Sequence, residues 1–129
     1  MATTPLDPEE LLPLTPAVFH VLLALAGGER HGYAIMQEVT ASTQGRVKMG
    51  PGTLYGTVKR LLAARLIEES DERPDPQLDD ERRRYYRLTA LGQRAVQAEA
   101  ARYAEIVEVA RGKRLLGKPV RIARAGGAE

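Results

Sequence analysis

The sequence predicts an α+β fold that is mainly α-helical and carries one small β-hairpin. Three features predict this class: apolar residues with the period of amphipathic helices, one pair of segments rich in strand formers, and cap or turn residues at the ends of most segments. The chain has 129 residues, of which 43% are hydrophobic and 28% charged. This is the composition of one globular domain with a modest core.

Composition also excludes several classes of protein. The longest apolar run, Val21 to Ala26, is far shorter than the ~20 residues that cross a bilayer, and the acidic N-terminus is unlike a signal peptide. Cysteine is absent, which excludes disulfides and thiolate metal sites and fits a reducing cytoplasm. We therefore expect a cytoplasmic protein without a membrane partner.

Charge is unevenly distributed, although the net charge is only +2. Residues 1–29 contain no Lys or Arg, whereas basic residues gather at 46–65, 82–87 and 111–128. Such clusters suit a polyanionic partner such as nucleic acid, although an ordinary solvated surface would also explain them.

The first helix is predicted to begin at Thr15-Pro16, a cap residue followed by proline at the first helical position. It is apolar all round, which indicates the buried central helix, and Gly27-Gly28 would end it. An N-terminal arm, residues 1–13, precedes it and includes one short helical turn. A second helix is expected over about 31–43, and residues 46–49 predict a very short strand.

The third helix is predicted to begin near Gly52 or Thr53. Its buried stripe has helical spacing and consists of Leu54, Val58, Leu61 and Leu62. The opposite side carries Thr53, Gly56, Lys59, Arg60 and Ala63. Gly56 is unusual there, since glycine in an exposed helix interior costs about 1 kcal/mol relative to alanine. Either a partner approaches this side closely, or the position is simply tolerant.

A β-hairpin is predicted from strands at 66–70 and 83–88, joined by a long acidic connection. Side chains alternate along a strand, so one of Tyr85 and Tyr86 should be buried and the other exposed. Helices joined by a tight turn and followed by a hairpin form a winged helix-turn-helix, here over residues 14–88. In that arrangement the third helix lies in the DNA major groove, and the hairpin, or wing, lies over the adjacent backbone.

A long C-terminal helix, residues 89–111, is predicted after the cap residue Thr89. Apolar residues repeat along it at alternating spacings of four and three: Val96, Ala100, Tyr103, Val107 and Ala110. This is the seam of a helix packed along another helix, and a second apolar side, including Ile106, would face the domain. One small domain covers only one side, so a homodimer is the simplest partner for the seam. A basic, flexible tail, residues 112–129, follows.

Catalytic and metal-binding patterns are lacking in the sequence. With two histidines and no cysteine the case for a metal site is weak, and His31 is expected to cap or pack against the second helix. No nucleophile–base spacing and no glycine-rich phosphate loop occurs. We expect a protein that is not an enzyme and holds no cofactor or metal.

The motifs resemble those of the PadR-like transcriptional regulators over about residues 14–110. The matching stretches follow in the family's order: 31–35, 50–55 with 59–61, 66–68, and 83–89 with Leu91-Gly92. The resemblance implies a homodimer with a winged-helix head and a C-terminal dimerising helix. It also implies that the dimer represses a nearby operon by binding a near-palindromic operator. A small aromatic effector would release the dimer from this DNA.

The resemblance also implies which residues meet double-stranded DNA. On the third helix, which would read the DNA bases, these residues are Thr53, Tyr55, Lys59 and Arg60. Gly56 is a fifth candidate on this helix, because it faces outward. Those on the wing are Arg82, Arg83 and Arg84, and Lys48 would lie on the short strand before the reading helix. Tyr55 is at least as well explained as a brace between that helix and the wing.

The sequence departs from the family pattern at three places. The wing loop, residues 71–81, is acidic and would repel phosphate. Tryptophan is absent, so Phe19 and Tyr103 are the candidates for an aromatic effector pocket, with roles in the core as the alternative. The basic tail extends beyond the short form of the family. Two other functions remain open: a winged-helix protein-interaction module, and a nonspecific DNA binder that acts through the tail.

Overall fold

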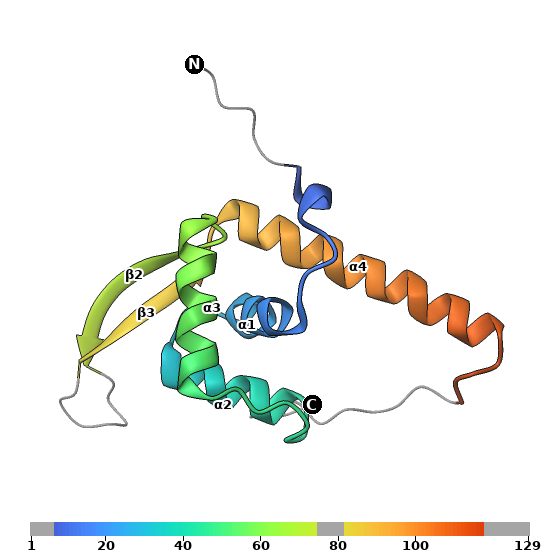
Figure 1. The fold of residues 1–129 in the computed structure, drawn as a ribbon, viewed down its shortest axis with the longest axis horizontal. Coiled ribbons are helices and arrows are strands. Elements are labelled where there is room, and N and C mark those ends of the chain that lie inside the picture. The colour runs from blue at the N-terminus through green and yellow to red at the C-terminus, as the bar shows by residue number, and fades with distance from the viewer. Residues whose placement is uncertain (1–6, 75–81, 118–129) are drawn as a thin grey trace, which may run out of the picture.

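The computed structural model describes residues 7–74 and 82–117 and confirms the α+β class. Figure 1 shows the elements, which follow in the order η1 (Pro8–Leu11), α1 (Pro16–Ala26), β1 (Arg30–His31), α2 (Gly32–Ser42), α3 (Pro51–Ala63), β2 (Ile67–Pro74), β3 (Arg82–Leu88) and α4 (Ala90–Gly112). Most of the predicted acidic wing loop and most of the basic tail lie outside the described residues. Within the described residues, no helix is both long and apolar enough to cross a bilayer.

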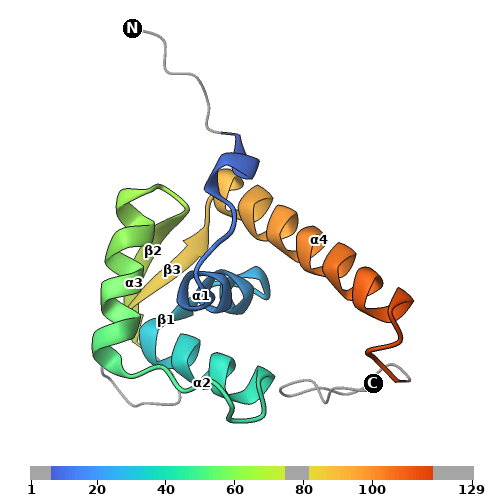
Figure 2. The same ribbon diagram turned by 45° about the vertical axis from the view of Figure 1, so that its right-hand side comes forward.

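Helix α1 lies at the centre of the molecule. It packs against α2, α3, α4 and β3, and Figure 2 shows the other helices arranged around it. The predicted cap is confirmed, because the Thr15 hydroxyl oxygen accepts the Val18 N–H at 3.3 Å. The helix is not buried all round as its composition suggested, since Leu23 is 42% exposed.

The sheet has three antiparallel strands in the order β1-β3-β2. The strand predicted at residues 46–49 is wrong: this segment is a loop, and Lys48 lies exposed on it. Strand β3 has two edges, of which β2 occupies one and the two-residue β1 occupies the other. No edge of β3 is left for residues 46–49.

Both wing tyrosines are buried, so the prediction that one of them is exposed is wrong. Tyr85 is 8% and Tyr86 is 5% exposed. Tyr86 joins the hydrophobic core, whereas Tyr85 packs edge-on against the ring of His31 with 5.3 Å between centroids. The physical reason is that β3 is the central strand, and β1 supplies cover on the face that a two-stranded hairpin would leave open.

Helix α4 divides into a packed half and a projecting half. Its first part buries Gly92, Ala95, Val96 and Glu99 against the domain. Gly92 fits because it has no side chain: a Cβ there would overlap the carbonyl oxygen of Leu66. The rest of the helix extends away from the body (Figure 1). Ile106, expected to face the domain, is 48% exposed, because the domain ends before the helix does.

The N-terminal segment is tied to α4 by a buried carboxylate. The Leu14 N–H donates to Glu99 Oε2 at 2.7 Å, and Arg102 Nε donates to Glu99 Oε1 at 2.5 Å. The hydrogen bond from Arg102 lowers the pKa of Glu99, assisted by the backbone donor and opposed by burial. The predicted short turn in the arm is present as η1, which contacts α4.

Candidate nucleic-acid interface

Helix α3 presents a polar face to solvent, because its apolar stripe is used by the core. Leu54, Val58 and Leu61 are buried, as predicted, and Leu62 is partly buried against them. The outward side has Thr53, Lys59, Arg60 and Ala63 exposed and Gly56 half-buried. Sequence reasoning missed Thr57, which is fully buried; its hydroxyl donates to the Thr53 carbonyl at 2.7 Å.

Tyr55 braces α3 against the start of α2. Tyr55 is 46% exposed, yet its hydroxyl oxygen would lie 2.5 Å from a Cβ built on Gly32. Glycine at position 32 therefore permits the tyrosine to sit directly above the first turn of α2. That turn is capped by His31, whose Nδ1 accepts the Ala34 N–H at 3.1 Å, which confirms the capping role expected for this histidine.

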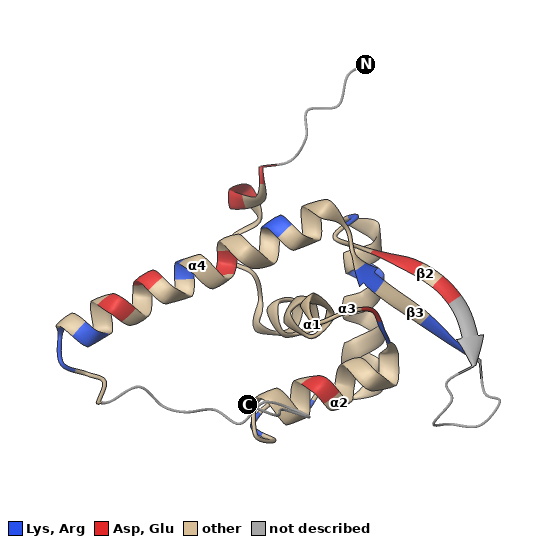
Figure 3. Cartoon of the chain, turned by 180° about the vertical axis from the view of Figure 1, so that it is seen from behind, with Lys and Arg blue, Asp and Glu red and all other residues tan. Residues whose placement is uncertain are grey.

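The two strands of the wing carry opposite charges. Figure 3 shows acidic residues along β2 and basic residues along β3. Arg84 is exposed and Arg83 is half-buried, while the side chain of Arg82 lies outside the described residues. Glu68 and Arg87 form an ion pair at 2.7 Å, and the hydrogen bond from this pair raises the pKa of Arg87. Part of the positive charge of β3 is therefore compensated within the wing.

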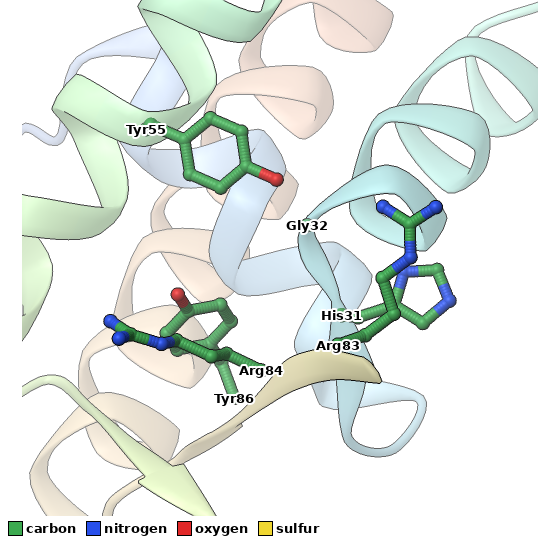
Figure 4. A pocket seen from close by; sticks show the side chains of 6 residues that line it. All are labelled: His31, Gly32, Tyr55, Arg83, Arg84 and Tyr86. Atoms are coloured by element: carbon green, nitrogen blue, oxygen red, sulfur yellow. The ribbon is translucent and has the colours of Figure 1, made fainter. Parts of the chain in front are cut away.

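Three of the predicted DNA-binding residues line one cavity. It has a volume of about 170 Å³ and lies between α3, the start of α2 and the wing, as Figure 4 shows. Its lining consists of His31, Gly32, Tyr55, Arg83, Arg84 and Tyr86. Sequence reasoning missed His31, Gly32 and Tyr86 as parts of this site. The glycine directly after a helix cap was the available signal, because it marks a place where another element approaches closely.

Lys59 and Arg60 lie apart from this cavity, further along α3. The Arg60 guanidinium donates to the Thr57 hydroxyl at 3.4 Å, and Arg60 lines a second pocket together with Leu11 and Pro13. Lys59 is exposed. The interface thus has two basic parts, one at the wing cavity and one on the second half of α3.

The remaining predicted residues lie on α4 and α1. Val96 belongs to the core of its own chain, whereas Ala100, Tyr103 and Val107 are exposed and Ala110 is half-buried. The rings of Phe19 and Tyr103 contact each other, with 4.9 Å between their centroids. In the described part of the chain, no three histidine or acidic side chains gather where they could hold a metal ion.

A match to a family model identifies the family of this chain. The model of the transcriptional regulator PadR-like family matches residues 21–98, which include the second half of α1, all of α2 and α3, the sheet and the start of α4. The chain belongs to the PadR-like family. The family is one of transcriptional regulators, and the motifs in the sequence of this chain identify the same family.

Two related sequences are similar to this PadR-like chain. One is an uncharacterized 37.1 kDa protein in transposon TN4556 of Streptomyces fradiae, 38% identical over 80 residues, which are 62% of this chain and 21% of that protein. The other is an uncharacterized protein X of Lysinibacillus sphaericus, 29% identical over 89 residues, which are 69% of this chain and 79% of that protein. The chain thus matches only about a fifth of the length of the first of these relatives.

Solved structures share the fold. A PadR family transcription regulator from Clostridium difficile superposes with a TM-score of 0.63 at 22% identity, over 80% of this chain and 100% of that one. A Streptococcus transcriptional regulator gives a TM-score of 0.63 at 24% identity, over 75% and 90% of the two chains. RosR of H. salinarum gives 0.56 at 24% identity, over 82% and 99%. At these identities the likeness shows the winged-helix fold alone.

Proposed function

We propose that this PadR-like regulator is a sequence-specific repressor that binds DNA through the outward face of α3 and the basic side of the wing. The supporting observation is the exposure of Lys59 and Arg60 on α3, together with a separate cavity lined by Arg83 and Arg84. An exposed helix face of this kind enters the major groove, and arginine and lysine there bind guanine edges or phosphates. Gly56, between these two parts, allows the DNA to approach the helix backbone.

The regulator acts as a homodimer joined through the projecting half of α4. Four large apolar side chains on this half are 37% to 59% exposed: Tyr103, Ile106, Val107 and Val109. Exposed apolar residues on a helix that projects beyond its own domain can pack against the same helix of a second chain. A twofold dimer would bind a near-palindromic operator with both α3 helices. Val96 is occupied by the core, so the seam begins at Ala100.

A small aromatic effector would release the repressor by contacting the ring pair of Phe19 and Tyr103. Phe19 is 8% exposed and Tyr103 is 37% exposed, so the tyrosine offers the accessible edge. Tyr103 also belongs to the proposed seam. An effector here would alter the packing of α4 and hence the separation of the two DNA-binding heads.

The test uses the full chain and the DNA that lies upstream of its own gene. Binding is titrated at several salt concentrations against this duplex and against a shuffled duplex of the same composition. The proposal predicts preference for the upstream duplex and an affinity that falls steeply with salt, because phosphate contacts release counterions. Equal affinity for both duplexes, or no dependence on salt, would contradict it.

A protein-interaction module is the second candidate, and the acidic strand β2 favours it. Glu68 and Glu69 are exposed on the wing, where a DNA backbone would be repelled. This alternative predicts that a protein partner is captured and that no duplex is bound at any salt concentration. A nonspecific binder acting through the tail predicts instead that deletion of residues 112–129 abolishes all binding to DNA.

A further inference from the structure

The cavity between α3, α2 and the wing is a chemically distinct site. Its described lining contains two guanidinium groups and two phenol hydroxyls and no carboxylate. Arginine can only donate hydrogen bonds, and a tyrosine hydroxyl donates readily to an anion. Figure 4 shows the hydroxyl of Tyr55 pointing across the cavity towards Gly32, with Arg84 and Tyr86 below it. The site is therefore built from side-chain donors that come from two separate elements, α3 and β3.

Helix α2 adds a positive electrostatic end to the cavity. Gly32 is the first residue of this 11-residue helix, and it lines the cavity together with Tyr55. Amide groups in the first turn of a helix favour an anion, and one of them, that of Ala34, is already bound by His31. The helix end assists the arginines and does not define the site alone.

One acidic group opposes an anion at this place. Glu69 on β2 is the cross-strand partner of Tyr86 on β3. Burial raises the pKa of the Tyr86 hydroxyl, the charge of Glu69 raises it further, and the charge of Arg84 lowers it. Glu69 and Arg84 thus act on the Tyr86 hydroxyl, which lines the cavity, with opposite signs, and this provides two variants with opposite expected effects.

We propose that this cavity binds one phosphate group of the DNA backbone, with Arg84 and the Tyr55 hydroxyl as its donors. The inference rests on the proposed function, because DNA is the source of the phosphate. Inorganic phosphate offers the same chemistry, and the experiment separates the two sources. Tyr55 would then do more than brace α3: its hydroxyl fixes a backbone phosphate relative to the helix that contacts the bases.

The first arm measures affinity for the upstream duplex over a range of salt concentrations. Arg84→Gln should weaken binding and reduce the slope of log affinity against log salt by about 0.9, the value for one phosphate contact. Tyr55→Phe keeps the ring above Gly32 and loses only the hydroxyl, so affinity should fall about tenfold with no change in slope. Glu69→Gln should tighten binding.

The matched control is Arg94→Gln, which removes one exposed positive charge from α4 outside the cavity. It should leave both the affinity and the slope close to those of the wild type. Thermal unfolding of every variant checks that the variant keeps the fold. If Arg94→Gln and Arg84→Gln change the slope equally, the effect is one of net charge, and the site is overturned.

The second arm titrates inorganic phosphate, with chloride at matched ionic strength, into the ¹⁵N-labelled full chain. The amide resonances of Gly32 and Tyr33 should shift with phosphate in the wild type and not in Arg84→Gln. The inference fails if the Gly32 resonance does not shift and neither Arg84→Gln nor Tyr55→Phe alters DNA affinity. If Lys59→Ala still weakens DNA binding in that case, the proposed function stands. Phosphate binding at Gly32 without binding to any duplex would overturn DNA as the source.

Discussion

Gly56 lies at the middle of the exposed face of α3, and a Cβ placed on it would meet no heavy atom within 4 Å. Nothing in its own chain therefore requires glycine. Gly56→Ala should raise the free energy of unfolding by about 0.5–1 kcal/mol, because alanine is the better helix former. If DNA approaches the helix backbone here, the same variant should bind the upstream duplex more weakly.

Urea unfolding and DNA titration on the same Gly56→Ala sample check this prediction together. A gain in stability accompanied by a loss of affinity supports close approach. A gain in stability with unchanged affinity would show that the position is merely tolerant, which is the other interpretation that the sequence allows.

At Gly92 we expect alanine to destabilise the fold, in contrast to Gly56, because the Leu66 carbonyl oxygen occupies the position of a Cβ there. Gly92→Ala should lower the free energy of unfolding by about 3 kcal/mol, since α4 or the α3–β2 connection must move. The control is Gly112→Ala at the end of α4, where a Cβ would meet nothing within 4 Å. Equal unfolding midpoints in urea for Gly92→Ala and Gly112→Ala would show that α4 does not pack this closely.

Local patterns predicted single residues well where the cause is local. Thr15 and Thr89 cap helices as expected, since hydroxyl caps act within three residues. The burial of Tyr85 could not be predicted this way. It depends on β1, a two-residue strand far away in the sequence that shows no alternation of its own.

At the scale of the elements, Glu99 joins α4 to the N-terminal segment and should make stability depend on pH. The pKa of Glu99 is lowered in the folded chain, chiefly by Arg102. A carboxyl with a lowered pKa stabilises the fold above its unfolded pKa of about 4.3, and this contribution is lost as the pH falls through the folded value. Near neutral pH, Glu99→Gln should therefore be less stable than the wild type by about 1–2 kcal/mol.

Urea unfolding of the wild type and Glu99→Gln from pH 7 to pH 3 tests the contribution of the Glu99 carboxylate to stability. The difference between the two proteins should shrink below about pH 4, as the wild-type carboxyl is protonated. Glu108→Gln is the control, because its ion pair with Arg111 is exposed and should contribute little. A difference that stays constant over the whole range would contradict the role assigned to the Glu99 carboxylate.

The two halves of α4 show what a helical repeat can and cannot predict. The spacing of four and three residues correctly indicated that the helix has more apolar surface than one partner needs. It could not show which positions the chain itself covers. Val96 is enclosed by its own core, and Ile106 lies beyond the domain, because the point at which the domain ends is a property of the whole fold.

At the scale of the whole molecule, the exposed half of α4 predicts a dimer. Ile106→Glu combined with Val107→Glu should give a monomer, since charges would be buried at the seam. The variant should stay folded, because both side chains are 41% or more exposed within their own chain. DNA affinity should also fall strongly, because one head binds only half of an operator.

Sedimentation velocity and circular dichroism check the dimer prediction. Leu115→Glu is the matched control, since Leu115 is 72% exposed beyond the end of α4 and should leave the dimer intact. A wild-type chain that is monomeric at micromolar concentration, both free and bound to the upstream duplex, would contradict the proposed assembly.

The central claim is that α3 contacts DNA through its outward cations, and one comparison of variants tests it most directly. The double variant Lys59→Ala and Arg60→Ala is compared with Arg94→Ala and Arg111→Ala, which removes the same charge from the exposed side of α4. Affinity for the upstream and the shuffled duplex is measured at matched salt. We expect the α3 variant to lose preference for the upstream duplex and at least about tenfold in affinity, while the α4 variant keeps both. Retained preference in the α3 variant, or equal losses in the two variants, would contradict the account.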